Sequence, residues 1–378
     1  MEGGNYFFYL SVFVVLFEMK KILFTVINSL SFDQRMERIC TALAEAGFTV
    51  ELIGRKTDVS LALKEKPYKQ KELNCFIQSG KLFYLEYNIR LFFYLLFRKC
   101  DAICAIDLDT IVPCYIVSRL RSKKIIYDAH EYFTELIEVV HRPAVRKVWL
   151  SIESFFVPRC DIAYTVSESI KNIFNEKYKT NFRLIRNVAR LENHEVRHDK
   201  EEKYLIYIGA VNAGRGLEQL IEAMRFIDCK LYICGKGDLF DAMVKLSEEL
   251  KVADKVRFLG FVEPEKLKTL TRNAYLGFLL LDNSSKSYYY SLANKFFDYI
   301  HAGIPQITVD FPEYRFINER YKVAELIALD VAEIVKAVHK LLNDKAYYQS
   351  IVDNTIAARE AYNWQKESQA LLEIYQAI

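Results

Sequence analysis

The chain has 378 residues, of which 52% are hydrophobic and 27% are charged, and its formal net charge is +3. This balance excludes an intrinsically disordered chain, and the length indicates two domains rather than one ordinary core. A charge so close to neutral, without a long basic run, gives no indication of nucleic-acid binding. The eight cysteines include no CxxC pair. They therefore predict neither a structural zinc site nor a disulfide framework, and a reduced, cytosolic setting is expected.

Residues 1–18 precede the first clear strand pattern. Residues 6–17 form an apolar run that is shorter than the roughly 20 residues of a membrane-spanning helix. The run lacks the basic leader and the small-residue cleavage site of a signal peptide. We interpret residues 1–18 as an extension from a misassigned start, and a short membrane-touching anchor is the alternative.

The first half of the chain alternates strand and helix patterns. Residues 22–26 form a near-continuous apolar run, interrupted only by Thr25, which is typical of a strand buried on both faces of a parallel sheet. Apolar residues at helical spacing follow over residues 36–43, and residues 48–53 predict a second strand. The turn at residues 28–31 reads Asn-Ser-Leu-Ser, where a dinucleotide-binding fold has Gly-x-Gly. NAD or FAD binding is therefore not expected.

Residues 82–97 predict a helix with an unusually broad apolar face. Aromatic and aliphatic residues dominate it, and Arg98 and Lys99 follow directly. One interpretation is a helix that packs into the core. The alternative is a helix that rests on a membrane surface, because basic residues flank the apolar face.

Asp107 and Asp109 follow the strand predicted over residues 102–106. Two aspartates one residue apart hold a metal ion in some nucleotide-sugar enzymes. Here the pair lies in the half without phosphate-binding features, and alternate residues of a strand point to opposite faces. We expect no metal site.

The strand predicted over residues 124–127 leads to Asp128, His130 and Glu131 at its carboxyl end. Ligands of open α/β sheets collect at this edge. A histidine beside a glutamate can donate to a hydroxyl or phosphate, or can act as an acid or base. A histidine satisfied by the local backbone is the equally open alternative.

The second half repeats the pattern after a polar, charged stretch at residues 192–203. This composition shift predicts the domain boundary, with domains at residues 19–187 and 188–361. A strand over residues 204–208 is followed by a loop in which Arg215 lies between Gly214 and Gly216. The two glycines let the backbone approach an anion while the guanidinium points into the same space.

Residues 287–305 contain the most informative segment. A tyrosine-rich, poorly periodic loop runs into a short helix with Lys295 in its first turn and Asp298 about one turn later. Gly303 and Pro305 end that helix. A helix N-terminus with a lysine suits a phosphate, and the aspartate suits a neighbouring hydroxylated group. An amphipathic helix with both charges solvated is the alternative.

Together these motifs resemble the retaining glycosyltransferases of the GT-B type, specifically the group-1 bacterial family that builds surface polysaccharides. The resemblance covers nearly everything from Met19 onward. It implies two Rossmann-like domains that face a central cleft, with residues 362–378 crossing back to the first domain. The residues that match the family's motifs are His130, Arg215-Gly216, Asn294-Lys295-Phe296-Phe297-Asp298-Tyr299, Ala302-Gly303-Ile304-Pro305 and the helix at Trp364.

The resemblance also implies roles for individual residues. Arg215 and Lys295 would bind the diphosphate of a nucleotide-sugar donor, Asp298 the ribose hydroxyls, and His130 would face the transferred sugar as the catalytic residue. Preplaced cations would stabilise the leaving diphosphate without a metal ion, and no cofactor besides the donor is expected. The remaining expected donor-side residues are Gly214, Gly216, Tyr290, Ser291 and Leu292, and the expected acceptor-side residues are Asp33, Arg35 and Glu131.

The sequence departs from the family's pattern at two places. The family often has two glutamates eight positions apart, where this chain has Tyr290 and Asp298. Tyr290 cannot serve as a carboxylate, so backbone groups of residues 289–292 are expected to contact the sugar or phosphate. Gly209-Ala210 stands where the family commonly has another basic residue.

The predicted function is a hexosyltransferase-like enzyme that moves a sugar from a nucleoside diphosphate to a glycan or lipid-linked acceptor. We expect it in the cytoplasm, with peripheral contact at the inner face of the cytoplasmic membrane. A nucleotide-sugar epimerase with the same two-domain cleft is the first alternative. A non-catalytic nucleotide-sugar-binding protein is the second.

Overall fold

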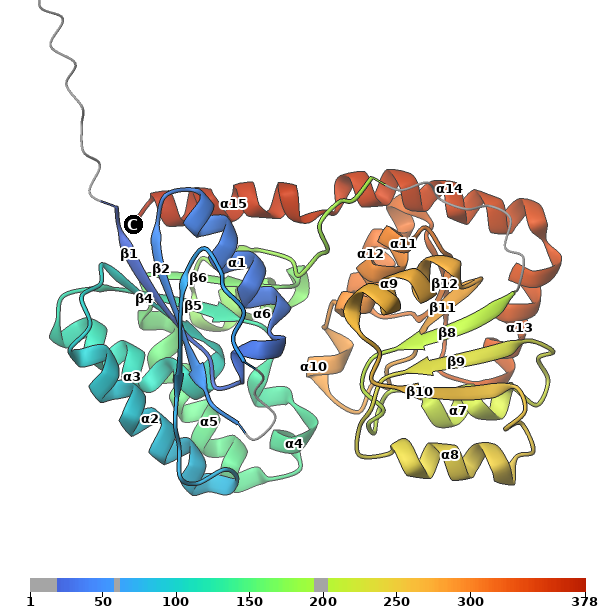
Figure 1. Ribbon diagram of the computed structural model, residues 1–378, viewed down its shortest axis with the longest axis horizontal. Coiled ribbons are helices and arrows are strands. Elements are labelled where there is room, and N and C mark those ends of the chain that lie inside the picture. The colour runs from blue at the N-terminus through green and yellow to red at the C-terminus, as the bar shows by residue number, and fades with distance from the viewer. Residues whose placement is uncertain (1–18, 58–61, 194–202) are drawn as a thin grey trace, which may run out of the picture.

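The structure is a computed structural model of the chain, and it describes residues 19–57, 62–193 and 203–378. The predictions for residues 1–18 lie outside the described residues. Within them the chain forms two α/β domains, each built around one parallel sheet (Figure 1). The predicted α/β class is therefore confirmed.

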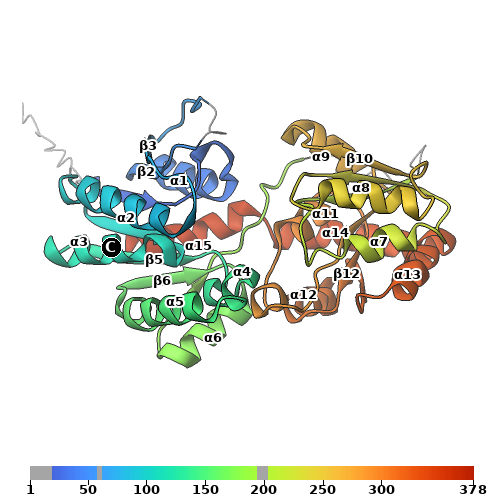
Figure 2. The same cartoon turned by 90° about the horizontal axis from the view of Figure 1, so that it is seen from below.

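The first sheet has seven strands: β1 (Lys21–Thr25), β2 (Thr49–Arg55), β3 (Lys69–Leu73), β4 (Ala102–Ile106), β5 (Lys124–Ala129), β6 (Ile162–Thr165) and β7 (Arg183–Leu184). Their order is β3-β2-β1-β4-β5-β6-β7. The accompanying helices are α1 (Gln34–Glu45), α2 (Gly80–Leu96), α3 (Asp107–Leu120), α4 (Ile137–Val140), α5 (Pro143–Phe156) and α6 (Glu168–Tyr178). α1 packs against one face of the sheet, and α2, α3 and α5 pack against the other (Figures 1 and 2).

The second sheet has six strands: β8 (Tyr204–Ile208), β9 (Lys230–Cys234), β10 (Val256–Gly260), β11 (Leu276–Leu279), β12 (Gln306–Val309) and β13 (Ala324–Ile327). Their order is β10-β9-β8-β11-β12-β13. The accompanying helices are α7 (Leu217–Ala223), α8 (Phe240–Glu249), α9 (Pro264–Asn273), α10 (Lys286–Tyr289), α11 (Asn294–Ala302), α12 (Pro312–Tyr321), α13 (Val331–Asn343) and α14 (Lys345–Ala361).

The last strand of the first sheet ends at Leu184, and the first strand of the second sheet begins at Tyr204. The boundary predicted between residues 187 and 188 lies in this interval. The exact assignment of residues 188–361 to the second domain stays a prediction.

The last helix, α15 (Trp364–Gln376), leaves the second domain and lies against α1 of the first (Figure 1). Asn363 begins it, because its side chain accepts a hydrogen bond from the backbone N–H of Lys366 at 3.1 Å. Tyr375 is fully buried, and its hydroxyl lies 3.0 Å from that of Tyr164. Burying a large side chain of this kind contributes roughly 1.5–3 kcal/mol, so the predicted return of the chain to the first domain is a stable connection.

Three strands are not visible in the sequence pattern. β3 is an edge strand with the sequence Lys-Gln-Lys-Glu-Leu, and most of its side chains are exposed or half-buried. Edge strands of this kind carry charges that prevent pairing with other chains, and so they lack an apolar run. β7 has only two residues, and β13 is half-buried.

Candidate functional site

A cavity of 780 Å³ lies between the two domains. Its walls include residues that follow β1, β5 and β6 in the first domain and β8 and β11 in the second. The carboxyl ends of both sheets therefore open into it, which is where open α/β sheets bind ligands. Its size is that of a small-molecule site. The predicted site residues among its walls are Asp33, Arg35, His130, Glu131, Arg215, Ser291, Leu292, Lys295 and Asp298.

α11 carries Lys295 and Asp298 into this cavity. The helix follows Ala293, which gives it no side-chain cap, and both Ala293 and Asn294 line the cavity. Gly303 ends the helix with φ of 71°, a left-handed conformation that suits glycine, as predicted. The first-turn N–H groups and the positive end of the helix dipole favour an anion in the cavity.

Lys295 is a buried amino group without a carboxylate partner. Burial, and next the charge of Arg215, hold the pKa of Lys295 well below its usual range, although Asp298 acts in the opposite direction. Its Nζ lies 4.0 Å from the centre of the Tyr207 ring. Among the described residues, no carboxylate lies within ion-pair distance of Lys295 or Arg215. A bound phosphate would supply the missing negative charge.

Arg215 reaches the same cavity from the loop after β8. Its guanidinium lies 4.8 Å from the centre of the Tyr288 ring, and its buried Nε has no hydrogen-bond partner. Gly214 and Gly216 have φ of 78° and 65°, and neither lines the cavity. Both glycines allow left-handed turns on either side of Arg215, and their direct approach to an anion stays a prediction.

The loop before α11 differs from the prediction in two ways. It contains the helical turn α10, which Ser285 caps by accepting a hydrogen bond from the N–H of Tyr288. Tyr290 was expected beside the donor, but it does not line the cavity. Its carbonyl accepts a 2.9 Å hydrogen bond from the Ser167 hydroxyl of the first domain, and its ring packs against that domain's core. Tyr290 therefore holds the two domains together.

His130 is fixed from two sides at the cavity wall. Its Nε2 lies 3.0 Å from Oδ2 of Asp128, and its backbone N–H donates to Asp107 at 2.9 Å. Burial lowers the pKa of His130, but the Asp128 carboxylate outweighs burial, and the net shift is upward. A charged imidazole that faces a sugar or phosphate can donate a hydrogen bond there. The structure therefore contradicts the alternative in which the His130 side chain makes its hydrogen bonds with the local backbone alone.

Two further carboxyl groups surround this histidine. Burial raises the pKa of Asp107 to about 6 despite the charge of His130. Burial, and then the charge of Asp107, raise the pKa of Glu131 to about 8. Glu131 lines the cavity, where burial favours its protonated, hydrogen-donating form.

Asp107 and Asp109 were expected at the end of a strand. They lie instead in the first turn of α3. Asp107 has φ of 54°, which is unusual for a residue other than glycine. Asp109 is buried, and burial holds its pKa well above the usual range. No group of three or more His, Cys, Asp or Glu side chains is placed to hold a metal within the described part of the chain.

Arg35 was expected on the acceptor side, and the structure places it in the cavity wall with its charge paired inside the protein. It is 4% exposed, and its guanidinium donates to the Asp128 carboxylate at 3.0 Å and to the carbonyl of Ile185 at 3.1 Å. Asp33 lines the cavity, and its side chain caps α1 by accepting from Met36 N–H. Arg35 is therefore a positioning residue. Asp128 is a site residue that local sequence does not reveal, because Arg35 lies 93 residues away.

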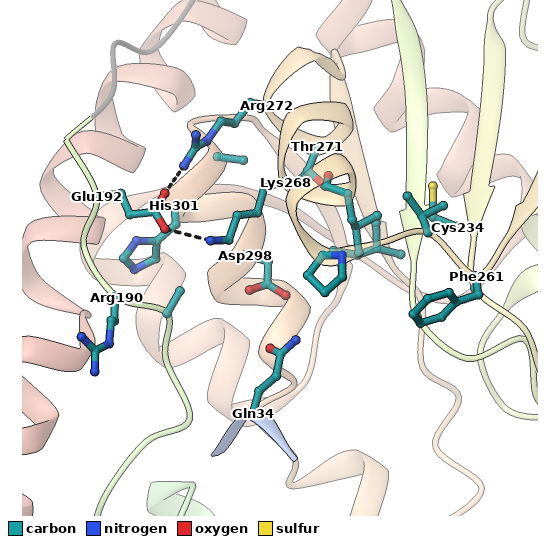
Figure 3. A pocket seen from close by; sticks show the side chains of 18 residues that line it. Gln34, Arg190, Glu192, Cys234, Phe261, Lys268, Thr271, Arg272, Asp298 and His301 are labelled. Carbon is teal, nitrogen blue, oxygen red and sulfur yellow. Dashed lines mark hydrogen bonds and ion pairs between the residues drawn. The ribbon is translucent and has the colours of Figure 1, made fainter. Parts of the chain in front are cut away.

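A second cavity of 330 Å³, drawn in Figure 3, shares Asp298 with the first cavity. Asp298 of α11 and Gln34 of α1 both point toward it, and Phe261 lies at its other side (Figure 3). Glu192, in the segment that joins the domains, accepts hydrogen bonds from Lys268 and Arg272 of α9. Burial raises the pKa of Asp298 to about 6, against the charges of Arg38, Lys295 and Lys268.

Comparisons with known proteins agree with this arrangement. Residues 189–358 match the family described as "Glycosyl transferases group 1", and residues 34–192 match "Glycosyltransferase Family 4". An uncharacterized glycosyltransferase of Methanocaldococcus jannaschii is 26% identical over 226 residues, which are 57% of this chain and 56% of that protein. The chain thus matches just over half the length of that curated relative.

Three solved structures share the fold along nearly the whole chain. Sucrose-phosphate synthase from Thermosynechococcus elongatus has a TM-score of 0.79 at 18% identity, with 95% of this chain and 98% of that chain covered. Anabaena HepE in complex with UDP and glucose has a TM-score of 0.76 at 12% identity, covering 95% and 100%. A TarM mutant of S. aureus in complex with Fondaparinux, alpha-GlcNAc-glycerol and UDP has a TM-score of 0.70 at 11% identity, covering 95% and 99%. The chain belongs to the group-1 glycosyltransferases and has their GT-B fold.

Proposed function

We propose that this protein transfers a sugar from a nucleoside-diphosphate sugar to a hydroxyl group of an acceptor. One observation carries the proposal. Lys295, which is buried, and Arg215 face the same cavity at the N-terminus of α11, and neither has a carboxylate partner among the described residues. Such unpaired cations are costly unless a ligand neutralises them. A diphosphate fits this requirement.

In the proposed reaction, the bond between the anomeric carbon and the diphosphate oxygen breaks, and its electron pair leaves with the diphosphate. The acceptor hydroxyl forms the new bond to that carbon and loses its proton, which the departing phosphate oxygen can take. Lys295, Arg215 and the N–H groups of α11 stabilise the negative charge that develops. These groups supply the charge stabilisation without a metal ion. We propose attack on the face that the diphosphate leaves, with retention of configuration.

His130 and Glu131 are proposed to contact the transferred sugar. Both line the cavity on the side opposite to α11. The upward pKa shifts of the imidazole and the carboxyl group favour the protonated, hydrogen-donating form of each. Hydrogen bonds to sugar hydroxyls would orient the anomeric carbon toward the acceptor. Ser291 and Leu292 line the same cavity and are proposed to contact the donor beside Lys295.

The adjoining cavity of 330 Å³ is the proposed nucleoside site. Asp298 lies at the junction of the two cavities, where its carboxylate would accept hydrogen bonds from the ribose hydroxyls. The base would then lie toward Phe261 and Val262. UDP in the HepE and TarM structures supports a nucleoside diphosphate as the donor's leaving group, and glucose with HepE supports a hexose.

We further propose a glycan or lipid-linked acceptor in the assembly of a bacterial surface polysaccharide, on the cytoplasmic side of the membrane. The glycan and the glycosylated glycerol in the TarM structure support an acceptor of this kind. Eight cysteines without a disulfide pattern support a reducing compartment.

The direct test incubates the purified chain with a panel of nucleotide-sugars and measures release of nucleoside diphosphate. We expect slow hydrolysis of one donor, with Lys295→Ala lowering the rate at least 100-fold and chelation of divalent metal leaving it unchanged. Lys286→Ala is the matched control, because Lys286 is an exposed lysine of the neighbouring helical turn. Epimerised donor without nucleotide release would instead support the epimerase. Donor binding without any turnover, with or without glycan acceptors, would support the non-catalytic alternative.

A further inference from the structure

α2 has two apolar faces, and only one of them is used inside the protein. The first face, formed by Phe83, Tyr87, Leu91 and Leu95, is buried against the sheet and α3. The second face points outward. Leu82, Leu85, Ile89 and Phe93 follow one another at helical spacing, and they are 63%, 58%, 49% and 55% exposed. The outward face of a helix that contacts only water is normally polar, so this row of apolar side chains is not expected there.

Aromatic residues extend this stripe at both ends. Phe76, just before the helix, is 89% exposed, and Phe97, at its end, is 80% exposed. Phe76 is held in place, because Glu86 accepts hydrogen bonds from the N–H groups of Phe76 and Ile77, at 2.9 and 2.8 Å. We call the exposed residues Phe76, Leu82, Leu85, Ile89, Phe93 and Phe97 the α2 surface.

Basic side chains border the α2 surface. The Arg90 guanidinium lies 4.8 Å from the centre of the Phe76 ring, and exposed Arg98 and Lys99 follow Phe97. A groove of 690 Å³ runs between α2 and the edge strand β3, and its walls join apolar Ile89 and Phe93 to Arg90 and Arg98. Arg90 pairs with Glu86 at 2.7 Å, and Arg98 pairs with Glu51 at 3.4 Å. Lys71 and Glu72 also line this groove, and Glu72 already lies 3.4 Å from the Ser29 hydroxyl.

We propose that the α2 surface docks the protein on an anionic lipid bilayer. Apolar side chains with aromatic ends and a basic border match the acyl boundary and the negative headgroups of such a bilayer. A symmetric contact between two copies would instead bring the basic borders together. Within the described part of the chain, no helix has the length and hydropathy to cross a membrane, so the contact lies in the interface plane.

The docked orientation places the cavity near the membrane. α2 follows β3 in a parallel sheet, so its N-terminal end lies at the carboxyl edge of the sheet, where His130 also lies. Asn88 of α2 donates to the carbonyl of Asp109 at 2.9 Å, in the turn that also holds Asp107. The N-terminal end of the α2 surface therefore lies at the same edge of the sheet as the cavity.

Co-sedimentation of the full chain with lipid vesicles tests this docking. The assay contains neither donor nor acceptor, so its outcome does not depend on the transfer reaction. We expect the chain to sediment with phosphatidylcholine vesicles that contain about one third phosphatidylglycerol, and much less with phosphatidylcholine alone. The double substitution Ile89→Glu/Phe93→Glu should weaken binding more than tenfold. The matched control Phe226→Glu/Phe316→Glu, at second-domain side chains that are 56% and 57% exposed, should bind as the wild type does.

A second variant isolates the charge contribution without touching the apolar stripe. Lys71→Gln/Lys99→Gln changes two exposed lysines and should weaken binding about fivefold for each charge removed. Wild-type binding by the Ile89→Glu/Phe93→Glu variant would place the contact elsewhere, including residues 1–18, and would overturn the proposal. A wild-type protein that sediments with none of the vesicles would also overturn the proposal. A wild-type dimer in light scattering that the same substitutions dissociate would assign the surface to a second copy.

Discussion

Asp128 holds His130 and Arg35 with the two oxygens of one buried carboxylate. Oδ2 lies 3.0 Å from His130 Nε2, and Oδ1 accepts from the Arg35 guanidinium at 3.0 Å. The two attractions outweigh burial and lower the pKa of Asp128. The helix α1, the strand β5 and the cavity wall are thereby joined through a single side chain.

Substitution of Asp128 by Asn should therefore affect both stability and His130. It leaves the Arg35 charge buried and unpaired, and the free energy of unfolding should fall by about 3–5 kcal/mol. Denaturant unfolding measures this loss. Asp310→Asn is the matched control, because Asp310 forms an exposed pair with Arg315 at 2.8 Å and should cost less than about 1 kcal/mol. Equal losses in the two variants would contradict the role of Asp128.

The same substitution should lower the pKa of His130, which an NMR titration measures. In the wild type this pKa is raised above its ordinary value of 6.5. The stabilisation from charged His130 is therefore complete at low pH and is lost as the pH rises through the folded-state pKa. In Asp128→Asn this pH dependence of stability should shrink. An unchanged His130 titration would show that Asp107 alone sets its charge.

Gly209 should be required for the position of Lys295. A side chain at residue 209 would meet Lys295 Nζ at 3.1 Å, and Gly209 has φ of 125°. Gly209→Ala should displace the lysine and weaken nucleoside-diphosphate binding about tenfold or more. Gly47→Ala is the control, since Gly47 has φ of 92° and nothing within 4 Å of an added Cβ. Both variants should lose about 1–3 kcal/mol of stability, and only the first should lose affinity in calorimetric titrations.

Asp298 should give donor binding a pH dependence. Burial raises the pKa of Asp298 to about 6, so the proposed acceptor of ribose hydrogen bonds loses its charge as the pH falls through about 6. Affinity for a nucleoside diphosphate should drop over this range, and Asp298→Asn should abolish that part of the profile. Asp241→Asn, on the exposed side of α8, should keep it. If the Asp298→Asn variant kept the wild-type pH dependence of affinity, a group other than Asp298 would be responsible for it.

The sequence predicts best what depends on neighbouring residues. Lys295 and Asp298 share one helix, and Gly303 ends it. His130 comes directly after a strand that is apolar enough to recognise. Each of these features follows from spacing over a few residues and from the direction of one element.

Features that depend on distant partners could not be predicted in this way. Arg35 has the charge of an acceptor-binding residue, but Asp128 neutralises it from 93 positions away. Tyr290 lies in the segment that was expected to approach the donor, yet its carbonyl contacts Ser167 of the other domain. Residue spacing cannot predict these contacts, because they form only when the two sheets and their connecting helices pack together.

Calorimetric binding of a nucleoside and of its diphosphate tests the central claim most directly, with uridine and UDP as the first pair. If Lys295 and Arg215 hold the diphosphate, the wild type should prefer UDP by at least about 100-fold, which is roughly 2.7 kcal/mol. Lys295→Met should lose most of this preference, while the exposed control Lys286→Met should retain it. A Lys295→Met variant that still prefers the diphosphate as strongly as the wild type would contradict the account.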